Sequence, residues 1–190
     1  MTKLEYPFTE AKVRELKTGE SVAITGRIYT GRDKFHKFYR ENPDALEVDL
    51  KDGALYHCGP VVVDDGRGGY RVAAAGPTTS VRENPYEPFV IARSGVRIII
   101  GKGGMDADTL AAMKKHGAVY VQAVGGAAAI SAAAVKKVSG VSYLDEFGSA
   151  EAMWHFDVEN FTGVVAMDSH GNSLFDEVRS SSGRKLAELG

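Results

Sequence analysis

The sequence predicts an α/β fold in one domain, built around a buried parallel sheet. Between residues 96 and 135, apolar runs alternate with glycine loops and helical patterns, which is the rhythm of consecutive strand and helix units. Strands that are apolar throughout belong to parallel sheets, because crossover helices cover both faces of such a sheet. The length of 190 residues, with 44% hydrophobic and 25% charged residues, fits one globular domain spanning 1–190.

In the first half of the chain the predicted order is helix, strand, helix, strand and strand. Thr9 is a helix-capping residue and Gly19 a stop, which places a helix near 9–17. The alternating segment SVAITGRIY then predicts a strand, and the charged segment after it predicts a helix that ends before Pro43. ALYHCGPVVV and YRVAAAGP predict two more strands, separated by the polar turn DDGRGG.

The second half predicts two strand and helix units and a final strand pair. VRIII and VYVQ are the strands, each followed by a glycine loop and a helix, and the second helix runs through ISAAAVKKV. WHFDVENFTGVVAMDSHGNSLFDEV predicts a strand pair around the turn DSHGNS, with a peripheral tail after it. Ligands in open α/β folds bind outside the carboxyl ends of the strands, where the loops gather.

Composition excludes several functional classes. A net charge of −2 gives no general attraction to nucleic acid or acidic membranes, so an anion site has to be built locally. The single cysteine, Cys58, excludes an internal disulfide framework and cannot by itself hold an iron–sulfur cluster or structural zinc. It favours a reducing, cytoplasmic setting, and the N-terminus is too polar for a signal peptide. We interpret the uncharged run 117–135 as a strand, a turn and a small-residue helix, not as a membrane span.

Three cationic residues follow predicted strand ends. Arg32 comes after one strand and a glycine, and Lys102 stands in a glycine loop. Arg82 follows GPTTS, which alone is typical of a turn but also places the hydroxyls of Thr78 and Thr79 near a guanidinium group. Guanidinium groups bind carboxylates through two parallel hydrogen bonds, so this set fits a small dicarboxylate better than a neutral ligand. We expect these five residues to form one substrate-binding edge.

The loop IGKGGM departs from the common nucleotide-binding motifs. Met105 stands where a Walker A motif has Ser or Thr, and Asp106 replaces the third glycine of the dinucleotide fingerprint. Glycine N–H groups and the start of the next helix suit a small anion, with a packing turn as the alternative. His36 lies among basic residues that fit a solvated helix face, with general acid or base catalysis as the alternative.

Five motifs together resemble the β subunit, or fused C-terminal region, of the iron–sulfur hydro-lyases, namely class I fumarate hydratase and L(+)-tartrate dehydratase. They are GRIYTGRDKFHK, GPTTSVR, IGKGGM, AVGGAAA and W…VENFTGVVAMDSHGNSLFDEV, in this order between about residues 20 and 178. The resemblance implies a swivelling β/β/α domain of three layers, with a central parallel sheet and a second antiparallel layer. It also implies that the chain is half of an enzyme and inactive alone.

The resemblance implies the roles of the site residues as well. Arg32, Thr78, Thr79, Arg82 and Lys102 match the dicarboxylate-binding residues of the family, with Thr78 as the catalytic base. A free threonine hydroxyl is too weak a base at neutral pH, so neighbouring charge has to activate it. A partner α subunit is expected to hold a 4Fe–4S cluster on three cysteines, and the cluster iron acts as a Lewis acid on the departing hydroxide. This chain itself is expected to bind no metal.

Several alternatives stay open at this point. Hydration of fumarate to (S)-malate, a step of the tricarboxylic acid cycle, is the leading function, and dehydration of L(+)-tartrate to oxaloacetate is its rival. A non-catalytic anion- or nucleotide-binding module is the alternative from another class, supported only by the glycine loops. The assembly is a heterodimer, an α2β2 complex or a dimer of β chains. Gly31 stands where the family commonly has alanine, and the sequence assigns no role to His57 or Cys58.

Overall fold

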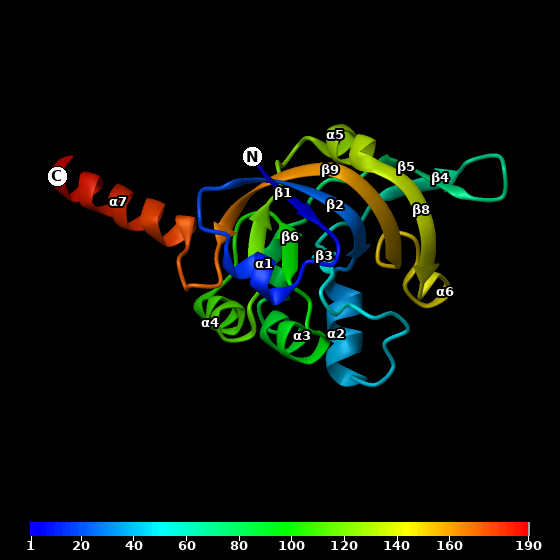
Figure 1. The fold of residues 1–190 in the computed structure, drawn as a ribbon, viewed down its shortest axis with the longest axis horizontal. Helices are drawn as coiled ribbons and strands as arrows, with labels where there is room; N and C mark the ends of the chain where they lie inside the picture. Colours follow the sequence, from blue (N-terminus) through cyan, green and yellow to red (C-terminus); the bar gives the residue numbers. More distant parts are fainter. Residues whose placement is uncertain (190) are drawn as a thin grey trace.

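The computed structural model describes residues 1–189 and shows a mixed α/β fold (Figure 1). One sheet contains parallel and antiparallel strands, in the order β1 (Thr2–Glu5), β2 (Ser21–Thr30), β3 (Ala54–Tyr56), β6 (Ile98–Gly101), β7 (Val119–Gln122), β9 (Met153–Met167) and β8 (Val135–Ser142). The first five of these strands are parallel to their neighbours, whereas β9 runs antiparallel to β7, β8 and β2. The mixed α/β class predicted from the sequence is confirmed.

The pairing of β2 with β9 closes part of this sheet into a ring. Residues 21–29 pair with residues 155–164, although more than a hundred residues separate the two strands in sequence. On its other side β2 continues through β3, β6 and β7 back to β9. In Figure 1, β9 arches over β6 and connects the two sides of the sheet.

The remaining elements surround this sheet. They are α1 (Glu10–Arg14), α2 (Asp33–Glu41), a 3₁₀ turn (Ser80–Glu83), α3 (Glu87–Ser94), α4 (Ala107–His116), α5 (Ala128–Ala134), α6 (Leu144–Phe147), α7 (Leu174–Leu189) and the separate hairpin of β4 (Val61–Asp64) and β5 (Tyr70–Ala74). Helices α2, α3 and α4 lie together on one side of the sheet, and α7 projects away from the body of the molecule (Figure 1). Among residues 1–189, no helix combines the length and the apolar character needed to cross a membrane.

Alternation along the central strands explains why they are apolar throughout. Ile98 and Ile100 belong to one hydrophobic cluster, which also contains Trp154. Ile99 points to the opposite face and packs in a second cluster with residues of α2, α3 and α4. Because both faces are covered, each side chain of β6 is buried, as the sequence pattern predicts.

Three predictions of local structure are wrong. The segment ALYHCGPVVV forms two strands, β3 and β4, which belong to different sheets. The helix predicted through ISAAAVKKV ends at Ala134, and the valine-rich continuation forms β8, where β-branched side chains are favoured. The final strand pair is instead the single strand β9, and the DSHGNS turn leads into α7. The Ser173 hydroxyl accepts a bond from the Asp176 N–H at 3.4 Å and so caps this helix.

Candidate functional site

The carboxyl ends of β2, β3, β6 and β7 meet at one edge of the sheet, as parallel pairing requires. Arg32 lies there because it follows β2 and caps the start of α2. Its Nη2 atom pairs with Glu151 Oε1 at 3.3 Å, and its Nη1 atom donates to the Ala150 carbonyl at 3.5 Å. Gly59, just beyond β3, gives this guanidinium room, since a β-carbon at that position would overlap Arg32 Nη1.

The GPTTS segment lies between the ends of β3 and β6. The Thr78 N–H donates to the His57 carbonyl at 2.7 Å, and Thr79 forms a parallel bridge with Lys102. The Lys102 side chain lies against the second glycine loop, where a β-carbon on Gly125 would stand 3.7 Å from Lys102 Cδ. The two threonines and the lysine therefore occupy neighbouring positions on the edge that Arg32 also occupies.

Arg82 reaches the same edge through an ion pair. Its Nη2 atom lies 2.5 Å from Asp33 Oδ2, and Asp33 directly follows Arg32. Among residues 1–189, no hydrogen bond involves the side-chain oxygens of Thr78 and Thr79 or the Nζ atom of Lys102. We call the set Arg32, Thr78, Thr79, Arg82 and Lys102 the cationic edge. Three of its polar groups are thus available to a ligand.

A hollow of about 320 Å³ opens beside the cationic edge. It is lined by the turn that carries Arg82, by the loop after Lys102 and by the start of α7, including Val81, Asn84, Gly103, Gly104, Phe175 and Arg179. The Phe175 ring lies over Gly104, whose positive φ of 74° and lack of a β-carbon permit this contact. The hollow places solvent space next to the loop that carries Lys102.

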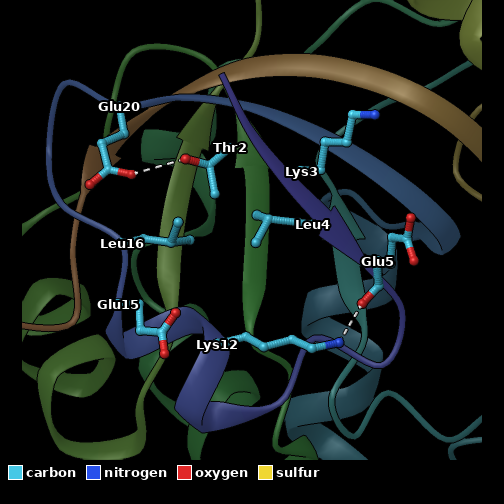
Figure 2. A pocket seen from close by; sticks show the side chains of 8 residues that line it. All are labelled: Thr2, Lys3, Leu4, Glu5, Lys12, Glu15, Leu16 and Glu20. Atoms are coloured by element: carbon cyan, nitrogen blue, oxygen red, sulfur yellow. Dashed lines mark hydrogen bonds between the residues drawn. The ribbon is translucent and has the colours of Figure 1, made fainter.

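A larger hollow, of about 580 Å³, lies elsewhere, between β1 and α1 (Figure 2). Its Lys12 side chain already donates to the carbonyl oxygens of Glu5 and Pro7, at 2.9 Å each. Thr2 donates to Glu20 across the mouth, at 3.4 Å. Because β1 pairs with the first half of β2, this hollow lies away from the carboxyl ends of the strands. Because it lies away from that edge, we do not assign the site there.

A group of buried polar side chains lies directly beneath the cationic edge. Its members are fully buried and come from five elements or their ends: His36, His57, Ser80, Glu83, Glu87 and Tyr120. His36 Nε2 and His57 Nε2 both bond to Glu87 Oε2, at 3.1 and 3.0 Å. His57 Nδ1 bonds to Ser80 Oγ at 2.9 Å, and Ser80 Oγ bonds to Tyr120 OH at 2.9 Å.

Burial and neighbouring charge shift the pKa values of this group in opposite directions. Burial raises the pKa of Glu83 to about 7, and it lowers the pKa of His57. For Glu87, burial alone would raise the pKa, but the hydrogen bonds from the two histidines outweigh it and lower the pKa. For His36, burial is likewise outweighed by the Glu87 carboxylate, which raises the pKa. Glu87 is therefore ionised at neutral pH.

Comparison with known proteins decides the family. The family model described as the fumarase C-terminus matches residues 1–178. The chain belongs to the fumarase C-terminus family. It is 51% identical over 98% of its length to a Geobacillus stearothermophilus protein provisionally named class I fumarate hydratase, and it spans 36% of that longer relative.

Two further members of the family are close to this chain in length. A Methanocaldococcus jannaschii protein, provisionally named L(+)-tartrate dehydratase subunit beta, is 41% identical over 98% of both chains. The Escherichia coli L(+)-tartrate dehydratase subunit beta is 31% identical over 92% of this chain and 86% of its own. The family resemblance predicted from the motifs is thus confirmed. Relatives named as beta subunits imply an α subunit beside them.

The described residues do not supply a thiolate set for an iron–sulfur cluster. Cys58 is the single cysteine of the chain, it is buried, and burial raises the pKa of its thiol to about 12. It therefore stays protonated at neutral pH, whereas cluster ligands are thiolates. A cluster in this fumarase-family protein requires cysteines from elsewhere.

His36, His57 and Glu87 also have the residue types of a metal site, with one ligand atom from each within 4.8 Å of the others. Each of these atoms already takes part in a direct hydrogen bond at 3.0 or 3.1 Å. Both imidazole Nε2 atoms have to carry protons to donate to the same carboxylate oxygen, and a protonated nitrogen cannot bind a metal. The three atoms are thus engaged in hydrogen bonds with one another, although Glu87 Oε1 has no partner among the described residues.

Sequence reasoning missed this buried group in the fumarase-family fold. The interpretation of His36 as part of a solvated helix face is wrong, since His36 is fully buried. The signal was present, because Phe35 and Tyr39 are spaced four residues apart and define an apolar face on which His36 also lies. Glu83 and Glu87 gave no such signal, because an acidic residue at a helix start is ordinarily exposed.

Proposed function

We propose that this chain is the β subunit of an iron–sulfur hydro-lyase that reversibly hydrates fumarate to (S)-malate. A cysteine-bearing α subunit would complete the site and hold the 4Fe–4S cluster. The observation that carries the proposal is the gathering of Arg32, Arg82 and Lys102 with two threonine hydroxyls on one edge of the sheet. A dicarboxylate has two charges to neutralise, and two guanidinium groups with one ammonium group suit that task.

In this proposal the cationic edge binds and orients the substrate. Arg82 is about half exposed and exchanges its contact with Asp33 for a substrate carboxylate. Lys102, whose Cδ atom lies beside Gly125, supplies a second positive charge to the substrate in this proposal. The hollow beside the loop of Lys102 gives the substrate space to enter. Exchange of an exposed ion pair costs little, because such pairs contribute about 0–1 kcal/mol.

Thr78 is the proposed base, and Thr79 the neighbouring hydrogen-bond donor to substrate. The backbone of Thr78 is fixed by its bond to the His57 carbonyl, which leaves the hydroxyl free to face a ligand. The positive charges of Arg32 and Arg82 stabilise the alkoxide form of a nearby hydroxyl and so lower the barrier to proton removal. When the partner is bound, its cluster supplies a Lewis acid for the departing hydroxide.

Tartrate dehydration is the second candidate, favoured by one specific observation. The Methanocaldococcus relative matches over nearly the whole of both chains and carries a tartrate dehydratase beta name. Both reactions remove or add water at a 2-hydroxy dicarboxylate, so the same cationic edge serves either. A non-catalytic anion-binding module remains the alternative from another class, supported by the glycine loops alone. We further propose a swivelling β/β/α domain that moves against a cytoplasmic α subunit, in a heterodimer or an α2β2 complex.

The proposal is tested by assembling the chain with its cysteine-bearing partner without oxygen and assaying fumarate and L(+)-tartrate in parallel. We expect the chain alone to be inactive and the complex to hydrate fumarate. Arg82→Ala in the complex should lower kcat/KM by the equivalent of about 2 to 4 kcal/mol, the scale of a lost charged contact to substrate. Strong fumarate hydration by the isolated chain would contradict the proposal.

Arg93→Ala is the matched control. Arg93 lies at the far end of α3 and pairs with Asp44 at 2.6 Å, and its exposure resembles that of Arg82. It removes one exposed arginine ion pair without touching the cationic edge. We expect normal turnover from this variant, and equal losses from both variants would mean that the cationic edge is not the site.

A further inference from the structure

We propose that His36, Glu87 and His57 form a charged positioning unit which, with Ser80 and Tyr120, holds the backbone of the cationic edge in its reactive arrangement. This inference rests on the proposed function, since the unit is inferred to serve the reaction at that edge. None of its members lies on the surface, so none is proposed to contact substrate.

The first step is the continuity of the hydrogen bonds. They run from the Arg32 carbonyl to His36 Nδ1 at 2.8 Å, and from His36 through Glu87 to His57. From His57 they continue through Ser80 to Tyr120, and the Ser80 N–H donates to the Lys102 carbonyl at 3.0 Å. One chain of bonds therefore passes from the segment of Arg32 to the loop of Lys102.

The second step is the charge of His36, which follows from what it faces. A carbonyl oxygen can only accept, so His36 Nδ1 has to donate to Arg32. Glu87 Oε2 is shared by two imidazoles, which is the pattern of an ionised carboxylate accepting from both. His36 therefore carries protons on both ring nitrogens, and it is an imidazolium ion buried against a carboxylate.

The third step is the state of His57. Burial lowers the pKa of His57, and the charge of His36 lowers it further, so we assign a neutral ring to His57. In that state Nε2 donates to Glu87, Nδ1 accepts from the Ser80 hydroxyl, and Ser80 accepts from Tyr120. His57 is thus neutral while His36 is charged. The charged and titratable groups facing the pair are Glu83 from the 3₁₀ turn, with Oε2 at 3.5 Å from His36 Nδ1, and Arg32 and Asp33 from the start of α2.

The fourth step connects the unit to the cationic edge through the backbone. His57 holds Thr78, because its carbonyl accepts the Thr78 N–H at 2.7 Å. Ser80 holds Lys102, because its N–H donates to the Lys102 carbonyl at 3.0 Å. His36 holds Arg32, through its ring and through its own N–H, which donates to the same carbonyl at 3.0 Å. The segments of Thr78 and Arg32 are thus fixed by members of the unit, and that of Lys102 is fixed by Ser80, which is bonded to the unit.

The fifth step is the effect of the unit on the stability of the fold. Glu87 Oε1 and both carboxyl oxygens of Glu83 are buried without a hydrogen-bond partner among the described residues. Buried unpaired oxygens destabilise a fold, and buried ion pairs are often replaced by apolar residues with no loss of stability. Stability is therefore not what this arrangement supplies. The gain lies in fixed geometry at the edge above it, where a displacement of about 1 Å can cost a hundredfold in rate.

The experiment uses the full chain for spectroscopy and the assembled complex for kinetics. Nitrogen-15 NMR of the imidazoles should show His36 protonated on both nitrogens at pH 7 and His57 protonated on Nε2 alone. Gly101→Ala should then disturb the unit without changing any charge, since a β-carbon there would collide with Ser80 Oγ and lie 3.2 Å from His57 Nδ1. We expect a shifted His57 signal and a kcat lowered by between about tenfold and a hundredfold.

Gly183→Ala in α7 is the control, because a β-carbon at that position would have no neighbour within 4 Å. The double variant His36→Leu with Glu87→Met is the second test. It removes both charges together, so the urea midpoint of unfolding should be retained while kcat falls by a similar factor. A purely structural role predicts the reverse, with a lower midpoint and normal kcat per folded molecule.

Three results would overturn the positioning unit. They are an unprotonated His36 nitrogen at pH 7, imidazole signals that change when a chelator removes a bound metal, and normal kcat in both Gly101→Ala and the double variant. Failure of the proposed function is separate, because it appears as a wild-type complex that acts on neither fumarate nor tartrate. In that case the positioning role fails with it, while the charge state of His36 is still decided by the spectra of the chain.

Discussion

Two regions of the molecule contain buried carboxylates, and these carboxylates differ in how many hydrogen bonds they accept. Asp168, in the turn after β9, accepts four hydrogen bonds: from the N–H groups of Thr18, His170 and Asn172 and from the Asn172 side chain, at 2.9 to 3.1 Å. Glu83 and Glu87, beneath the cationic edge, leave three oxygens without partners.

The difference distinguishes a structural anchor, Asp168, from the carboxyl groups beneath the candidate site, Glu83 and Glu87. Burial alone would raise the pKa of Asp168, but its hydrogen bonds outweigh burial and lower that pKa, so the charge is fully compensated and stabilises the turn. Hydrogen bonds satisfy the carboxyl groups of Glu83 and Glu87 only in part. Proteins retain such buried groups mainly where they serve a function other than stability. The predictions below test this contrast in order of expected effect.

The largest effect is expected from Asp168→Ala. It leaves the three backbone N–H donors of Thr18, His170 and Asn172 without their acceptor, so the free energy of unfolding should fall by about 3 to 5 kcal/mol. Urea denaturation of the chain measures this. The contrast would be contradicted if Asp168→Ala lowered the free energy of unfolding by less than the double variant His36→Leu with Glu87→Met does.

A smaller effect of opposite sign is expected from Glu83→Gln. Burial raises the pKa of Glu83 from 4.5 to about 7, so the folded protein binds this proton more tightly than the unfolded chain. Its contribution to stability is therefore full below about pH 4.5 and is lost as the pH rises to about 7.

Glutamine cannot ionise, so the variant should avoid this loss and exceed the wild type at pH 7.5 by about 1 to 2 kcal/mol. Unfolding curves at pH 5 and pH 7.5 measure the change. For Asp168 the sign is opposite, because its lowered pKa means that stability is lost only as the pH falls toward and below its ordinary range. Equal differences between Glu83→Gln and the wild type at both pH values would show that Glu83 ionises normally.

The smallest effect is expected from Asp65→Ala in the turn of the β4–β5 hairpin. Asp65 Oδ1 accepts the N–H groups of Arg67 and Gly69 at 2.8 and 2.9 Å, but the residue is fully exposed. Water replaces these bonds when the carboxylate is removed, so the urea midpoint should move far less than in Asp168→Ala. Similar shifts in the two variants would mean that burial does not set the strength of such turns.

The sequence predicted the parts of the fold that depend on local pattern. The apolar runs of β6 and β7 and the glycine stops after them identify buried parallel strands without reference to the rest of the chain. Arg32 and Lys102 follow β2 and β6, and parallel pairing brings the ends of these strands to one edge, whereas Arg82 follows β5 of the separate hairpin and approaches that edge through Asp33. Their roles remain predictions.

The rest depended on contacts between distant segments. Nothing local in β2 indicates that it pairs with β9. The segment after the DSHGNS turn was predicted to be a partner strand of the preceding one, but it begins α7. His36 and Glu87 come into contact only when α2 and α3 pack side by side. In the sequence, each of them taken alone is therefore predicted to lie on the surface. The alanine run of α5 favours helix as far as Ala134, and the sheet then overrides that preference in β8.

The ring closed by β2 and β9 has a consequence for how the protein is made. Strand β2 is complete early in synthesis, but its longest partner, residues 155–164, leaves the ribosome more than a hundred residues later. Until then β2 presents an open strand edge, and non-local pairings of this kind form slowly. The main sheet therefore reaches its final form only after residues 155–164 have been made, and the nascent chain is exposed to aggregation until then.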